Sequence, residues 1–156
     1  MKRLTASILL TALALGSGVA LAQDTYPAYS CMTKSDFMDR TGSKYENTDT
    51  VNSHTAACPV VRNNLAAGLA AGSTVVVFDQ NPNAGADVSC TLSVKNPSGT
   101  LVASSTRSTV GSNPNSQTLS FAALAQVVDG HYTLYCTVPA EWSGARSSIV
   151  SYSIMD

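Results

Sequence analysis

The chain has 156 residues, a formal net charge of −1, and 12% charged against 44% hydrophobic residues. Its length fits a single domain with a substantial core. The small negative charge excludes the basic face that nucleic-acid binding requires. No stretch after the N-terminal region is long and apolar enough to predict a membrane span.

Residues 1–22 have the three parts of a secretory signal peptide. Two basic residues are followed by an apolar stretch over residues 8–15 and by the A-x-A cleavage site Ala20–Ala22. A membrane anchor is the competing interpretation, but the run Gly16–Gly18 interrupts the apolar stretch. We therefore expect cleavage after this site and a location in the periplasm or outside the cell.

Residues 23–53 are polar and weakly patterned, with aromatic residues scattered among them. One short strand is expected over residues 44–47, after the turn signal Thr41–Ser43. We interpret this part as a polar N-terminal segment that is tied to a β-sandwich domain over residues 54–156.

From residue 54 onward, short segments alternate between apolar and polar residues and are separated by turn signals. This pattern predicts an all-β fold, an antiparallel β-sandwich of about seven or eight strands, either jelly-roll-like or immunoglobulin-like. Pro59 indicates an edge strand or a bulge near the start. The strands are expected over residues 54–61, 73–79, 86–95, 100–105, 117–123, 131–138 and 147–155.

The four cysteines predict two disulfides, as expected of an exported chain. Cys90 and Cys136 occupy matching places on the apolar faces of two expected strands. Four cysteines allow three pairings. We favour Cys90–Cys136, which would join two core strands, and Cys31–Cys58, which would tie down the N-terminal segment. Zinc binding usually needs closely spaced cysteine pairs, and this chain has none.

Three segments follow one another in an order found in secreted bacterial domains: Val94–Ala103, Thr118–Phe121 and Asp129–Leu134. This order resembles pre-peptidase C-terminal domains, and the resemblance implies a non-catalytic β-sandwich module. The chain also resembles small exported bacterial β-sandwich proteins of unassigned function through Cys58–Arg62 and Cys136–Pro139. A looser resemblance to immunoglobulin-like domains lacks a tryptophan between Cys90 and Cys136.

The loop from residue 79 to residue 87 is the best candidate metal site. Its oxygen-bearing side chains recur at odd positions, as in a calcium loop. The EF-hand pattern fails, because glycine falls one place late and Cys90 stands where a bidentate glutamate belongs. The competing interpretation is a hairpin loop built from turn-forming residues. The candidate calcium ligands are Asp79, Asn81, Asn83 and Asp87.

Trp142 is the single tryptophan and lies in an expected loop together with Arg146. An exposed loop tryptophan could stack on a sugar ring or anchor a partner, although a lone tryptophan more often plugs the end of a sandwich. Arg146 could bind a carboxylate, or pair with a neighbouring side chain.

His54 and His131 are the two histidines, and a hydrolytic site would need one of them beside a carboxylate and a nucleophile. No G-x-S-x-G motif occurs, so surface histidines are the simpler interpretation. A metal shared with neighbouring carboxylates has no support from the spacing. The carboxylates considered are Glu46, Asp49 and Asp129.

Together these features predict a non-catalytic secreted β-sandwich that acts in extracellular binding or as a structural component of the envelope, the matrix or an appendage. The alternative is a carbohydrate-binding module that uses Trp142 and loop tyrosines. A secreted hydrolase or inhibitor is the third hypothesis. The expected partner is a protein, a glycan or a second copy of the chain, and calcium is the one cofactor considered.

Overall fold

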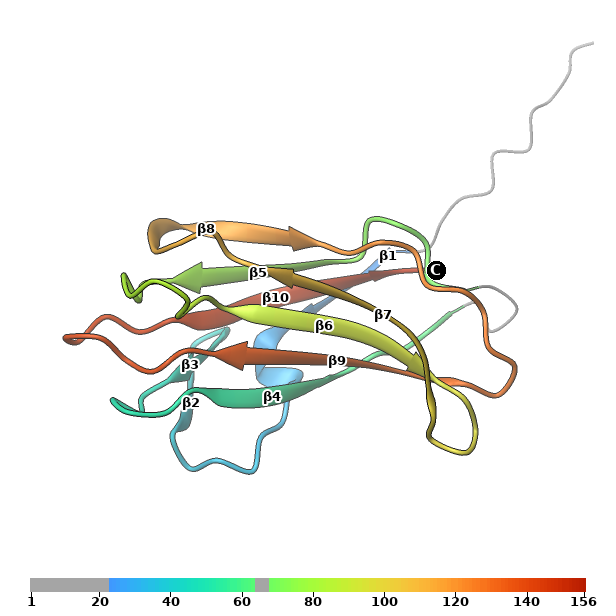
Figure 1. The fold of residues 1–156 in the computed structure, drawn as a ribbon, viewed down its shortest axis with the longest axis horizontal. Coiled ribbons are helices and arrows are strands. Elements are labelled where there is room, and N and C mark those ends of the chain that lie inside the picture. Colours follow the sequence, from blue (N-terminus) through green and yellow to red (C-terminus); the bar gives the residue numbers. More distant parts are fainter. Residues whose placement is uncertain (1–22, 64–67) are drawn as a thin grey trace, which may run out of the picture.

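The structure, a computed structural model, describes residues 23–63 and 68–156. The expected signal peptide, residues 1–22, lies outside the described residues. The described part has ten strands and one short 3-10 helix (Figure 1). They are β1 (Gln23–Pro27), η1 (Ala28–Ser30), β2 (Met38–Thr41), β3 (Lys44–Asn47), β4 (His54–Pro59), β5 (Thr74–Asp79), β6 (Ser89–Lys95), β7 (Leu101–Ser108), β8 (Asn113–Ser120), β9 (His131–Val138) and β10 (Ser148–Met155).

The strands form two antiparallel sheets. Sheet A has six strands, in the order β2-β3-β10-β5-β8, with β1 also paired to β10. Sheet B has four strands, in the order β4-β9-β6-β7. Figure 1 shows the longer strands of both sheets running along the long axis of the molecule, with most of the connecting loops at its two ends. The predicted all-β sandwich is therefore confirmed. Within the described residues, no helix has the length and hydropathy that crossing a membrane requires.

Two strands, β1 and β2, were not expected from the sequence. Strand β1 contains a proline and polar residues, and its extended state comes from pairing with β10, where Tyr26 stacks on Tyr152 with ring centroids 5.2 Å apart. Strand β2 forms a hairpin with β3 around Gly42, whose φ of 63° suits glycine. Both strands depend on their partners more than on their own sequence.

The N-terminal segment is part of the sandwich. Strands β1 and β3 both pair with β10, along different parts of its length, while β5 pairs with its other edge. The boundary expected between residues 53 and 54 lies at the start of β4, where the chain passes from sheet A to sheet B. A polar segment can form strands here because each strand of an antiparallel sheet needs only one apolar face, which packs on the core, while its other face meets solvent.

The core fills the space between the sheets. Strand β5 is apolar almost throughout, yet only alternate residues face the core. Val75 and Val77 face inward, whereas Phe78 is half buried. The Lys44 ammonium lies 4.3 Å from the centroid of the Phe78 ring. The buried apolar side chains of the strands are Met38, Tyr45, Val75, Val77, Leu119, Ile149, Tyr152 and Ile154 in sheet A, and Ala56, Cys58, Cys90, Leu92, Val94, Tyr132, Leu134, Cys136 and Val138 in sheet B.

Both expected disulfides are present, Cys31–Cys58 and Cys90–Cys136. Cys90 and Cys136 are direct partners in the register of β6 and β9, so this bond joins neighbouring strands of sheet B. An immunoglobulin-like domain would instead bond its two sheets together. Two disulfides are typical of proteins in the periplasm or outside the cell.

Candidate functional site

A groove with a volume of about 970 Å³ lies on the outer face of sheet B. We call it the aromatic groove. Its wall is the segment Met32–Phe37, and its floor is formed by His54, Thr55, Ala57 and Tyr135 of strands β4 and β9.

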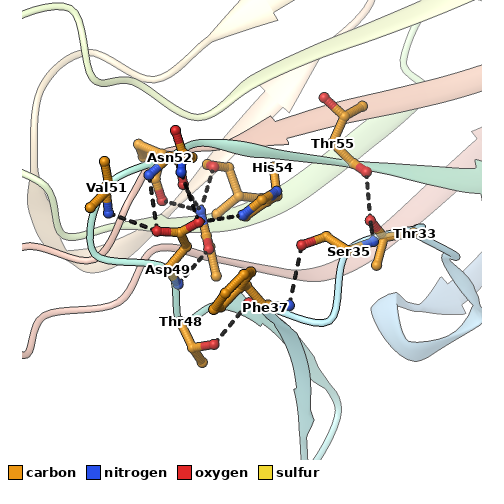
Figure 2. A network of polar contacts seen from close by, with 12 residues as sticks. Thr33, Ser35, Phe37, Thr48, Asp49, Val51, Asn52, His54 and Thr55 are labelled. Carbon is orange, nitrogen blue, oxygen red and sulfur yellow. Dashed lines mark hydrogen bonds and ion pairs between the residues drawn. The ribbon is translucent and has the colours of Figure 1, made fainter.

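The wall is fastened to the edge of β4. Met32 and Ala57 form an isolated antiparallel bridge, in which each N–H donates to the other carbonyl at 2.7 Å. The Thr33 hydroxyl donates to the Thr55 carbonyl at 3.0 Å (Figure 2). The Cys31–Cys58 disulfide joins the two residues that flank this bridge. The groove therefore has a fixed side, formed when the sandwich folds.

Phe37 stands at the end of the wall and is 52% exposed. Its carbonyl accepts hydrogen bonds from the N–H and the hydroxyl of Thr48, at 2.8 and 2.9 Å, and its N–H donates to the Ser35 hydroxyl at 3.2 Å. Its ring stacks on the His54 ring, with centroids 5.7 Å apart and planes 11° apart. This aromatic ring is held by contacts on its backbone and on one face, while the rest of it meets solvent.

His54 is itself held by Asp49, with its Nε2 2.8 Å from a carboxylate oxygen (Figure 2). The other oxygen of Asp49 accepts the N–H groups of Val51 and Asn52, at 2.8 and 3.1 Å. These backbone hydrogen bonds, together with the one from His54, hold the pKa of Asp49 well below its usual range. The carboxylate stays ionised, so Nε2 must carry the proton that they share, and this fixes the orientation of the ring.

The floor continues across the whole of sheet B as an array of hydroxyl groups. Tyr135, 40% exposed, is the one aromatic residue among them, with Ala57 and Thr91 as its register partners. Four pairs of hydroxyls on adjacent strands are 2.8–3.0 Å apart. These pairs are Thr55 with Thr137, Ser89 with Ser108, Thr91 with Thr106, and Ser93 with Thr133.

A second groove, the Trp142 groove, lies where the loops after β3, β5 and β9 meet, and has a volume of about 670 Å³. Trp142 is 48% exposed and lines it, as do Ser89 and Thr137 at the edge of the hydroxyl array. Arg146 comes from the same loop, where its Nε donates to Glu141 at 2.7 Å. The structure thus places Trp142 in a groove and Arg146 in an ion pair beside it.

The expected calcium loop uses its oxygens within the protein. Asp79 is fully buried, and its carboxylate accepts hydrogen bonds from Asn81, Val88, Thr109 and Ser147. Asn81 Oδ1 accepts the backbone N–H of Asn83, and Asp87 accepts that of Gly111. Asn83 itself contributes only this N–H to these bonds. Among the residues described, no group of three or more His, Cys, Asp and Glu side chains is arranged to hold a metal ion.

Sequence reasoning missed Phe37 and Tyr135, and it considered Asp49 beside the histidines only as a ligand of a shared metal, whereas the structure pairs it directly with His54. Tyr135 did leave a signal, because it interrupts the alternation of its strand by putting an aromatic residue on the polar face. Phe37 left none, since it lies in a segment without periodicity. His131 is exposed and lines neither groove.

No protein-family model and no curated protein matches the chain. Among solved structures, it is similar to CBM86, a low-affinity xylan-binding module from Roseburia intestinalis, with a TM-score of 0.52 and 13% identity over 86% of this chain and 96% of that one. This similarity shows the sandwich fold.

Two further solved structures are more distant. One is a family two carbohydrate esterase from Cellvibrio japonicus, with a TM-score of 0.44 and 9% identity over 87% of this chain and 34% of that one. The other is the carbohydrate-binding module CBM36 in complex with calcium and xylotriose, with a TM-score of 0.43 and 14% identity over 85% of this chain and 99% of that one.

Proposed function

We propose that the protein is a non-catalytic, exported binding protein whose ligand is a carbohydrate held in the aromatic groove. The observation that carries this proposal is the pair of half-exposed rings, Phe37 and Tyr135, that line one groove beside an array of hydroxyl groups.

A sugar ring suits this surface because it has an apolar face of C–H groups and a rim of hydroxyls. The apolar face can pack on an exposed aromatic ring, and the rim needs groups that both donate and accept hydrogen bonds. Serine and threonine hydroxyls do both, and they border Tyr135 on sheet B. A ligand site of this kind combines apolar contact with a few polar groups that set orientation.

The fixed wall favours binding as well. The Phe37 backbone is held by hydrogen bonds and its ring stacks on the His54 ring, so part of the ordering cost is met before a ligand packs on it. The Asp49–His54 pair supports this ring. Asp49 already accepts hydrogen bonds from Val51, Asn52 and His54, which suits a structural role more than general base catalysis.

The test is binding to immobilised polysaccharides, followed by calorimetry on those that retain the protein. We expect wild type to bind, and Tyr135→Ala or Phe37→Ala to weaken binding about tenfold or more, the loss of roughly 1.4 kcal/mol of stacking. Tyr29→Ala is the matched control, because Tyr29 is 51% exposed but lines neither groove.

Failure to bind any polysaccharide would overturn the proposal, and so would an equal loss in all three variants. Release of reducing ends or of ester groups from a bound polysaccharide would contradict its non-catalytic part. In that case His54→Gln, which removes the titratable group beside Asp49, should abolish the release.

A further inference from the structure

We propose that the aromatic groove and the Trp142 groove are the two ends of one site, which binds a stretch of a neutral polysaccharide chain several sugars long. This inference rests on the proposed function and specifies its ligand.

The two grooves meet on the surface of sheet B. Thr55 lines the aromatic groove and Thr137 lines the Trp142 groove, and the two residues are register partners whose hydroxyls lie 3.0 Å apart. Along β9, Tyr135 and Thr137 are alternate residues on the same face, about 7 Å apart. A single sugar placed on Tyr135 would leave Trp142 unused, whereas a chain can reach both.

The connecting surface is suited to a sugar chain because its hydroxyls have spare capacity. In each pair, one hydroxyl donates to the other, which leaves one O–H and several lone pairs free to meet a ligand. Such groups can form hydrogen bonds with sugar hydroxyls of different orientations along a polysaccharide. Aromatic rings at the two ends, Phe37 and Tyr135 in one groove and Trp142 in the other, provide apolar anchors.

The charges around the grooves favour a neutral chain. The paired hydroxyl positions carry no ionisable side chain. The Trp142 groove contains the carboxylate of Asp87, which has no cation against it in that groove, and that of Glu141, and the aromatic groove has Lys34 offset by Asp36. The cation beside the Trp142 groove, Arg146, is already paired with Glu141. A chain of uronates or sulfated sugars would meet repulsion from Asp87 at one end and no compensating cationic track along the hydroxyl pairs between the grooves.

The test is calorimetry with xylo-, cello-, malto- and chito-oligosaccharides, from monosaccharide to hexasaccharide. For the series that binds, we expect wild-type affinity to rise with length and then level off. Trp142→Ala should remove that rise, about tenfold for the longest members, and leave the shortest unchanged. Trp142→Tyr should restore most of it, because a stacking ring is retained. Thr137→Val, which removes a hydroxyl at nearly constant volume, should weaken only the longer members.

The outcomes separate the two proposals. If short sugars bind and Trp142→Ala leaves the dependence on length unchanged, the two grooves are independent and this inference is wrong, while the proposed function stands. Tighter binding of polygalacturonate than of any neutral polymer would overturn the neutral ligand. If no saccharide of any length binds, the proposed function itself fails. Tyr29→Ala again serves as the control.

Discussion

Asp49 organises the aromatic groove although it does not line it. The turn after β3 gives its carboxylate two backbone N–H groups, and His54 adds a third donor. This residue therefore sets the position of the His54 ring, and through ring stacking that of Phe37. A side chain remote from the ligand surface thus controls how that surface is presented.

The first prediction concerns acid stability. Folding lowers the pKa of Asp49, so its carboxylate stabilises the folded protein above its ordinary value of 3.8, and this contribution is lost as the pH falls below that value. Asp49→Asn should therefore lower stability at neutral pH and flatten the decline between pH 4 and pH 2. Urea unfolding followed by tryptophan fluorescence measures both.

The control for this prediction is Asp36→Asn, a change at an exposed carboxylate of the groove wall. It should leave the acid limb of the stability profile unchanged. If Asp49→Asn keeps the full wild-type decline, then Asp49 is not the group that the acid titrates.

The wall segment Met32–Phe37 shows how one element acquires its structure from others. The segment has no strand periodicity, and its backbone is fixed where it bridges Ala57 at the edge of β4. The Cys31–Cys58 disulfide adjoins that bridge. An edge strand that would otherwise expose unpaired backbone groups is thereby partly covered.

The second prediction is that Cys31→Ser with Cys58→Ser loosens the wall. The bond spans 27 residues, and its loss should reduce the free energy of unfolding by about 3 kcal/mol. We expect hydrogen exchange to accelerate at the amides of Met32 and Ala57, and any carbohydrate binding to weaken.

Cys90→Ser with Cys136→Ser is the matched control. This double variant should also lower stability. However, the Cys90–Cys136 disulfide joins strands that are already paired along their whole length, so hydrogen exchange at the Met32 amide should stay slow. Equal acceleration at Met32 in both double variants would show that the disulfide acts only through overall stability.

At the scale of the whole molecule, Asp79 connects the two sheets at the end that carries the Trp142 groove. Its partners follow β5 or precede β10 in sheet A, and precede β6 or follow β7 in sheet B. The buried carboxylate thus holds the loops in one arrangement. The Trp142 groove depends on that arrangement, because two of those loops line it.

The third prediction is that Asp79→Ala destabilises the protein by about 3 kcal/mol or more, because several buried donors lose their acceptor. Asp87→Ala, at a carboxylate that accepts one hydrogen bond from Gly111, should cost about 1 kcal/mol. Thermal unfolding measures both.

Calcium addition provides the complementary measurement. If these carboxylates serve the loops, calcium should leave the melting temperature of wild type unchanged. A rise with calcium that Asp79→Ala abolishes would instead support the metal site that the loop sequence suggested.

The sequence by itself determined the sandwich and most of its strands, because alternation and turn residues are local properties that each segment carries alone. Its four cysteines predicted two disulfides and favoured the pairing that the structure has. It indicated Trp142 as a candidate binding residue. Tyr135 was also visible in the sequence, as an aromatic residue on the polar face of its strand, but it was not interpreted as a binding residue. Only the tertiary structure decided that β1 and β2 are strands, that Asp79 is buried as an acceptor, and that Phe37, His54 and Asp49 meet. Those features depend on contacts between residues that are distant along the chain or lie in aperiodic loops. No periodic pattern in the sequence indicates which residues meet in such contacts.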